Sequence, residues 1–189
     1  APTDESPAMP RLFVAVDFPQ AVRQRLACLC GGVPGARWLP VEQFHLTLRF
    51  IGEVDNGVFA DVADSLADVH VPPFALHLSG VGHFPPRGAP RVLWAGVADG
   101  APLVRLHDKI ERRLQSLGLD PDGRKFHPHV TLARLKRAPI ERVKGFLGAH
   151  ADFASETVTL DAFHLYSSRL GAAGAVHRIE ASYALTTVA

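Results

Sequence analysis

The sequence predicts an α+β protein whose sheets are covered on one side by helices. Three observations lead to this prediction. Segments rich in β-branched and aromatic residues alternate with segments of helical spacing, and their order is nearly the same in both halves of the chain. The pattern His-x-Thr-Leu also occurs once in each half, at residues 45–48 and 129–132. A duplicated unit related by a pseudo-twofold axis would bring the two pattern strands together across a central groove.

The first half of the chain reads as strand, helix, strand, helix, strand. Pro19 begins the first helix, where its missing N–H does no harm, and Gly31 follows the end of that helix. Gly52 terminates the first pattern strand. The expected ranges are a strand at 11–18, a helix at 19–30, a strand at 44–51, a helix at 58–69 and a strand at 74–78.

The second half begins after a loop rich in proline and glycine at 83–90, and it repeats the order of the first. We expect one domain over residues 11–189, with halves of about 11–82 and 91–189, and residues 1–10 as a disordered extension or tag remnant. The expected ranges are a strand at 91–97, a helix at 102–117, a strand at 126–135, a helix at 140–148, a strand at 157–166 and a strand at 176–185.

Bulk composition excludes several functional classes. The net charge of +1 creates no global field for nucleic acid, so any polyanion must bind to a local patch. No apolar run approaches the length of a membrane span, and no signal-peptide pattern is present. The two cysteines, Cys28 and Cys30, are two residues apart in a segment expected to be helical, where they do not face each other. We therefore expect a cytoplasmic protein with reduced thiols and no membrane association.

The repeated pattern carries the chemistry. In a strand, successive side chains alternate between faces, so each copy places a histidine and a threonine on one face and two aliphatic residues on the other. Two such strands facing each other would offer two imidazoles and two hydroxyls, which suits acid–base chemistry on a phosphate. The alternative is a pair of half-buried strands, each with a histidine that has only a structural role.

Four segments resemble the 2H phosphoesterase superfamily, and within it the RNA 2′,3′-cyclic phosphodiesterases, also called 2′-5′ RNA ligases. The segments are RLFVAVDFP at 11–19, FHLTLRFIGEV at 44–54, RVLWAGV at 91–97 and FHPHVTLARLK at 126–136. The resemblance implies a bilobal fold with two pseudo-symmetric lobes of antiparallel sheet, outer helices and a central catalytic groove.

The resemblance also implies an activity. Members open a 2′,3′-cyclic phosphate to a 2′-phosphomonoester, and they can join such an end to a 5′-hydroxyl through a 2′-5′ bond without ATP. Neither reaction uses a metal or another cofactor. The expected partner is RNA with a 2′,3′-cyclic phosphate end, or a cyclic nucleotide, and we expect a monomer because the two halves already supply the paired motif.

By the family pattern, His45 is the proton donor and His129 the proton acceptor in hydrolysis, while Thr47 and Thr131 bind the phosphate. The residue chemistry agrees with this assignment. Opening a cyclic phosphate needs one proton removed from water and another delivered to the leaving ribose oxygen. Two imidazoles on opposite sides of phosphorus can do both near pH 7, and the threonine hydroxyls can donate to the nonbridging oxygens.

Two arginines are candidate phosphate ligands. Strand parity places Arg49 on the face of His45. Arg134 matches a phosphate-binding arginine of the family, but strict alternation would turn it away from His129, so a bulge or the strand end must turn it back. The alternative for both arginines is a solvated charge at a strand edge.

The remaining candidates have weaker support. Phe13 could line the groove or belong to the core, and His127 shares the face of His129 if the segment is extended. His177 lies where the family often has tyrosine, which puts in doubt any contact inferred from that tyrosine. A basic rim for the RNA backbone is expected from Arg124, Lys125, Lys136 and Arg137.

Two rival functions are open. His127 and His129 could be two zinc ligands of a metal-dependent phosphodiesterase, although no third ligand motif is evident and the first pattern would be unexplained. A non-catalytic RNA-binding module would use the same groove without turnover. Insensitivity to chelators and loss of turnover with the histidines would distinguish the two-histidine enzyme from both.

Overall fold

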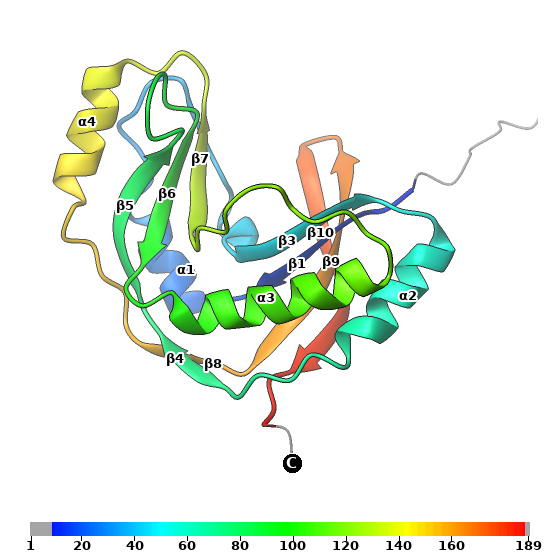
Figure 1. Ribbon diagram of the computed structural model, residues 1–189. Helices are drawn as coiled ribbons and strands as arrows, with labels where there is room; N and C mark the ends of the chain where they lie inside the picture. The colour runs from blue at the N-terminus through cyan, green and yellow to red at the C-terminus, as the bar shows by residue number, and fades with distance from the viewer. Residues whose placement is uncertain (1–8, 188–189) are drawn as a thin grey trace, which may run out of the picture.

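The computed structural model describes residues 9–187, so residues 1–8 of the expected extension lie outside the described part of the chain. Two four-stranded antiparallel sheets lie on opposite sides of the molecule, with the helices around them (Figure 1). The α+β prediction is confirmed. The strands are β1 (Arg11–Val16), β2 (Ala36–Trp38), β3 (Leu46–Glu53), β4 (Phe74–Leu76), β5 (Leu78–Phe84), β6 (Val92–Val97), β7 (Val130–Leu135), β8 (Val158–Leu160), β9 (Ala162–Gly171) and β10 (Gly174–Ala184); the helices are α1 (Gln20–Ala27), α2 (Asn56–Leu66), α3 (Ala101–Ser116) and α4 (Ile140–Ala149), with a 3-10 turn η1 (Val41–Gln43).

The two sheets are built in the same way from equivalent elements. One has the order β10-β9-β1-β3 and the other β2-β7-β6-β5, so β3-β1-β9 corresponds to β7-β6-β5. In each case the last strand comes from the other half of the sequence: β9 pairs with β1, and β5 pairs with β6. The sheets therefore do not coincide with the sequence halves 11–82 and 91–189, because the first half contributes β2 and β5 to one sheet and the second half contributes β9 and β10 to the other.

The strand exchange explains two differences from the predicted elements. The prediction of a single strand over 157–166 is wrong, because the chain changes sheets at Asp161. Before it, β8 pairs with β4, and after it, β9 pairs with β1. The predicted strand at 74–78 is likewise divided at His77, and β5 continues into the predicted loop at 83–90. The second pattern strand also begins at Val130 and not at residue 126.

The core lies between the sheets and their helices. The apolar stripe predicted for α3 is buried at Leu103, Leu106, Ile110 and Leu114, and this helix lies against β3 and α2. The opposite face of β1 carries a separate buried cluster, which is described below with the site. Each pattern strand is thus fixed by apolar side chains on one face and leaves the other face available for chemistry.

Two further expectations can be compared with the described residues. Within residues 9–187, no helix is long and apolar enough to cross a membrane. Cys28 and Cys30 are both free thiols, and they lie just beyond the end of α1.

Candidate active site

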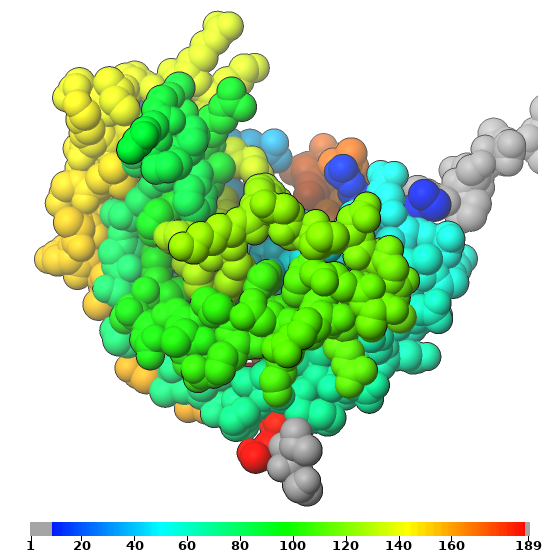
Figure 2. Space-filling model, viewed as in Figure 1, coloured from blue at the N-terminus to red at the C-terminus, as the bar shows by residue number. Residues whose placement is uncertain are grey.

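The two pattern histidines occupy equivalent positions, one residue before a strand. His45 precedes β3 and His129 precedes β7. The two strands come within 8 Å of each other between Cα atoms, although they belong to different sheets. Figure 2 shows that the surface is hollowed between the two lobes. The structure therefore brings the two pattern strands close together, as the sequence predicts.

His45 lies among aromatic rings. Its imidazole is stacked on Phe13, with ring centroids 5.1 Å apart, and on Tyr166 at 5.5 Å. The ring of His177 lies 5.2 Å away on β10. Burial lowers the pKa of His45, and repulsion by the neighbouring His177 adds to this, so that together they bring the pKa to about 4. His45 is therefore neutral near pH 7.

His129 has a similar aromatic environment and a fixed orientation. Phe84 meets it edge-on with ring centroids 4.9 Å apart, and Trp94 lies 6.2 Å away. Its Nδ1 lies 2.6 Å from the carbonyl oxygen of His127. A carbonyl only accepts, so Nδ1 carries the proton and donates it, and the neutral ring has its lone pair on Nε2. Burial lowers the pKa of His129, and this hydrogen bond opposes the shift.

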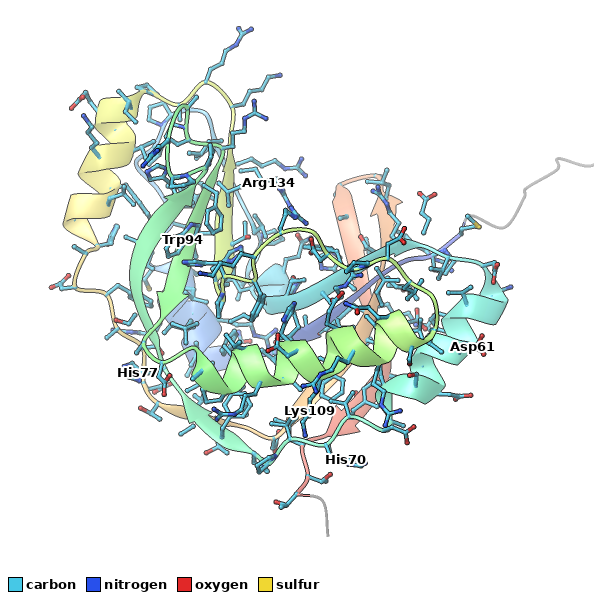
Figure 3. All side chains as sticks on the ribbon, in the orientation of Figure 1. Asp61, His70, His77, Trp94, Lys109 and Arg134 are labelled. Carbon is cyan, nitrogen blue, oxygen red and sulfur yellow. The ribbon has the colours of Figure 1, made fainter. Side chains whose placement is uncertain are left out.

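A bulge in β7 places Arg134 on the face of the strand that carries Thr131, here called the functional face. Thr131 pairs with Trp94 of β6, and the register then shifts by one residue. Leu132 and Ala133 are both buried as a result, and Arg134 emerges exposed on the side of Thr131. Figure 3 shows Arg134 extending from β7 toward the space between the sheets. The sequence required a bulge or a strand end to turn Arg134 toward the face of His129, and the structure contains a bulge there.

The same bulge in β3 has the opposite consequence for Arg49. Thr47 lies on the functional face, and the register of β3 with β1 shifts immediately after it. Leu48 and Arg49 are consequently both buried, and Arg49 lies opposite Val14, a core residue. The placement of Arg49 on the face of His45 is therefore wrong, because strict alternation does not hold through a bulge. Phe50 takes the position on that face instead, paired with Phe13.

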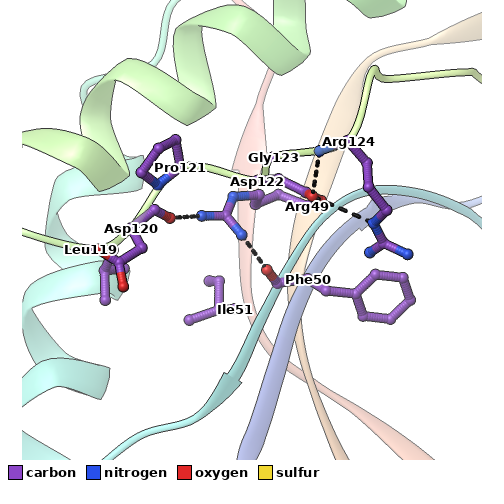
Figure 4. Close-up of a pocket in the computed structure, with 9 residues that line it drawn as sticks. All are labelled: Arg49, Phe50, Ile51, Leu119, Asp120, Pro121, Asp122, Gly123 and Arg124. Atoms are coloured by element: carbon purple, nitrogen blue, oxygen red, sulfur yellow. Dashed lines mark hydrogen bonds and ion pairs between the residues drawn. The ribbon is translucent and has the colours of Figure 1, made fainter.

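Arg49 has a structural partner on α3. Its Nε lies 2.6 Å from Glu111 Oε2, and both side chains are almost completely buried. The guanidinium also donates to the carbonyl oxygens of Phe50 and Asp120 (Figure 4). All its nitrogens thus have acceptors on the protein, and the interaction ties β3 to the loop after α3.

The other candidates divide between the groove wall and the surface. Phe13 is 3% exposed, since His45 and Tyr166 lie on it, so the structure supports its core alternative. The ring of His127 lies 5.0 Å from Trp94 in the cluster around His129. The four residues of the expected basic rim all lie outside the core: Arg124, Lys125, Lys136 and Arg137.

Sequence reasoning did not identify the rings that surround the two histidines. Tyr166, Phe84 and Trp94 come from three strands, two of which were displaced or missed in the predicted elements. Their positions follow from strand pairing, which the sequence did not specify. For Trp94, the alternation of side chains along β6 places the ring on the face of Thr131, but only once the pairing of β6 with β7 is known.

A metal centre was the main rival at this groove. Within residues 9–187, no group of three or more histidine, cysteine, aspartate and glutamate side chains is arranged to hold a metal ion.

Two neighbouring His-x-Thr strands from different sheets are the arrangement expected of a 2H phosphoesterase. The chain belongs to the 2′-5′ RNA ligase superfamily, whose family model matches residues 15–172.

Curated relatives of this chain share one name. The RNA 2′,3′-cyclic phosphodiesterase of Aeropyrum pernix is 48% identical over 108 residues, which cover 57% of this chain and 61% of that protein. The RNA 2′,3′-cyclic phosphodiesterase of Thermotoga maritima is 31% identical over 175 residues, covering 89% of this chain and 92% of that protein. The chain thus spans about three fifths of the first relative and nearly all of the second.

Solved structures share the architecture. The TT0787 protein of Thermus thermophilus superposes with a TM-score of 0.78 at 27% identity, covering 93% of this chain and 97% of that one. E. coli LigT complexed with 3′-AMP superposes with a TM-score of 0.75 at 24% identity, covering 95% and 99% of the two chains. This second likeness concerns the fold.

Proposed function

We propose that the protein hydrolyses RNA 2′,3′-cyclic phosphate ends to 2′-phosphomonoesters without a metal ion. The observation that carries the proposal is the pair of histidines, each beside a threonine, at one groove between two sheets. The names of the relatives, RNA 2′,3′-cyclic phosphodiesterases, support the substrate class.

His129 is the general base in this mechanism. Its Nδ1–H is held by the carbonyl oxygen of His127, so Nε2 offers a lone pair to the groove. Nε2 takes a proton from water as the water oxygen bonds to phosphorus. The hydrogen bond to the carbonyl stabilises the imidazolium that forms, in the way that an oriented acceptor does in other histidine bases.

His45 is the general acid. As the bond from phosphorus to the ribose 3′-oxygen breaks, His45 gives that oxygen a proton, which leaves a 3′-hydroxyl and a 2′-phosphate. Burial keeps His45 neutral in the free protein. The negative charge of a bound phosphodiester favours the charged imidazole, so substrate binding and protonation of His45 are coupled.

Thr47 and Thr131 donate hydrogen bonds to the nonbridging oxygens, where negative charge grows in the transition state. Arg134, which projects from the Thr131 face, supplies the positive charge that the neutral groups lack. The same groups could serve ATP-independent 2′-5′ ligation if a 5′-hydroxyl replaces water as the nucleophile.

Product analysis tests the proposal. The protein is incubated with 2′,3′-cyclic AMP in EDTA beside His45→Ala, His129→Ala and the control His70→Ala, an exposed histidine away from the groove (Figure 3). We expect 2′-AMP from the wild type and control, and a loss of about 10²–10⁴-fold in kcat with either catalytic variant.

Other outcomes would support a different function or a different leaving group. Loss of activity in EDTA would indicate metal-dependent hydrolysis, and 3′-AMP as the product would overturn the assigned leaving group. Binding of a cyclic end without turnover, unchanged in the two histidine variants, would indicate the RNA-binding module.

A further inference from the structure

A row of side chains crosses one sheet beside His45. Phe50, Phe13 and Tyr166 are direct cross-strand partners on β3, β1 and β9. Phe13 is 3% exposed and cannot receive another ring, whereas Phe50 is 54% exposed. The Phe50 and Phe13 centroids are 5.9 Å apart, and those of Phe13 and His45 are 5.1 Å apart. Phe50 is therefore an open aromatic surface two ring steps from the catalytic imidazole.

Phe50 also forms one side of a pocket of about 370 Å³. The loop after α3 forms the other side, and Arg124 extends from this loop on the same side of the pocket as the Phe50 ring (Figure 4). This volume lies in the lower part of the range for small-molecule sites, about 300–1,000 Å³. The remaining lining residues are Arg49, Ile51, Leu119, Asp120, Pro121, Asp122 and Gly123.

Hydrogen bonds and an ion pair fix the residues that line the pocket. Glu111, which pairs with Arg49 at 2.6 Å, also accepts a hydrogen bond from the backbone N–H of Asp122 at 3.2 Å. Asp122 in turn accepts from the backbone N–H of Arg124 at 3.1 Å and from its Nε at 3.4 Å. Because the loop is ordered by these contacts, a ligand loses little free energy in ordering it on binding.

An exposed aromatic face beside a guanidinium favours a planar, π-rich ligand attached to an anionic backbone. Nucleobases stack on phenylalanine and on arginine planes, and such stacking accepts any base. Because Phe50 lies two ring steps from His45, a nucleotide joined to one that reacts at His45 can reach the Phe50 ring.

We propose that Phe50 and Arg124 form a subsite for the nucleobase of the nucleotide that precedes the cyclic phosphate end. This inference rests on the proposed function and narrows its substrate class. The protein then acts better on an RNA end than on a free cyclic mononucleotide.

Kinetics with two substrates test the subsite. The value of kcat/KM is measured for 2′,3′-cyclic AMP and for the adenylyl-adenosine dinucleotide with a 2′,3′-cyclic phosphate. We expect the wild type to prefer the dinucleotide by about 5- to 150-fold, the factor that corresponds to one stacked base. Phe50→Ala removes most of this ratio, Arg124→Ala reduces it, and Phe50→Trp retains it.

Ile140→Ala, on the exposed side of α4, is the control and keeps the wild-type ratio. A wild-type ratio near one, or an unchanged ratio in Phe50→Ala, would overturn the subsite while the phosphodiesterase activity stands. Turnover of neither substrate by the wild type would instead reject the proposed function. Far-ultraviolet circular dichroism of each variant excludes unfolding as the cause of a lost ratio.

Discussion

Replacement of Arg49 by methionine tests the contribution of the buried ion pair to stability. The Nε of Arg49 lies 2.6 Å from Glu111 Oε2, with side chains 9% and 13% exposed. The same guanidinium donates to the carbonyl oxygens of Phe50 and Asp120. Methionine fills much of the volume but leaves the Glu111 carboxylate without its counter-charge.

The loss follows from burial. Removal of one partner from a buried pair costs about 3–5 kcal/mol, because the remaining charge stays desolvated. Small proteins have unfolding free energies of roughly 5–15 kcal/mol, so this loss is a large fraction of the total. At about 2–4 °C per kcal/mol for a chain of this size, we expect Tm to fall by roughly 6–20 °C.

Urea denaturation followed by circular dichroism measures the change in free energy of unfolding. Arg11→Met is the matched control, since it removes an exposed pair with Glu53 at 3.6 Å, whose side chains are 66% and 58% exposed. That pair contributes about 0–1 kcal/mol. If Arg49→Met loses no more than Arg11→Met, the structural role of Arg49 is refuted. The double variant Arg49→Met, Glu111→Leu should recover much of the loss, because no buried charge remains unpaired.

Three further predictions follow from the site. The pKa of His45 is about 4 in the folded protein and about 6.5 in the unfolded chain, so the free energy of unfolding should decrease by up to roughly 3 kcal/mol as the pH falls from 6.5 toward 4. Urea denaturation across this pH range should show a smaller decrease for His45→Gln, and an equal decrease would contradict the lowered pKa. Sulfate binding near pH 7 should take up a proton in the wild type and not in His45→Gln, which calorimetry in buffers of different ionisation enthalpy detects. Gly82→Ala would place its Cβ against the Trp94 ring, closer than two carbon atoms can approach, so we expect about 1–3 kcal/mol of destabilisation and reduced turnover. The control Gly145→Ala on α4, whose Cβ would meet nothing within 4 Å, should increase the free energy of unfolding by up to about 1 kcal/mol. An unchanged denaturation midpoint in Gly82→Ala would show that the Trp94 ring moves without cost.

Local patterns were sufficient for the helices and for most strands. The leucine and isoleucine stripe of α3 is buried as its spacing predicts, because a helix buries whichever face is apolar. The two pattern strands are present for a similar reason, since their aliphatic residues alternate with polar ones. Chain segments that change sheets were not recognised, because β8 and β9 differ in partner and not in composition.

The sequence alone was sufficient to propose which residues carry the chemistry. Two His-x-Thr patterns in equivalent places predicted that the two pattern strands meet, because a repeated unit tends to pair about a twofold axis. The structure brings β3 and β7, which follow His45 and His129, close together. The resemblance on the same segments led to the family that the comparisons show. These inferences depend on side-chain identity and local alternation, which the sequence contains in full.

Only the tertiary structure decided which side chains share a face. One extra residue in each pattern strand turns Arg134 toward the groove and turns Arg49 into the core, where Glu111 pairs with it. The rings around His45 come from β1 and from the consecutive strands β9 and β10, which are far from β3 in the sequence. Bulges and strand partners are set by long-range packing and hydrogen bonding, and no local pattern specifies them.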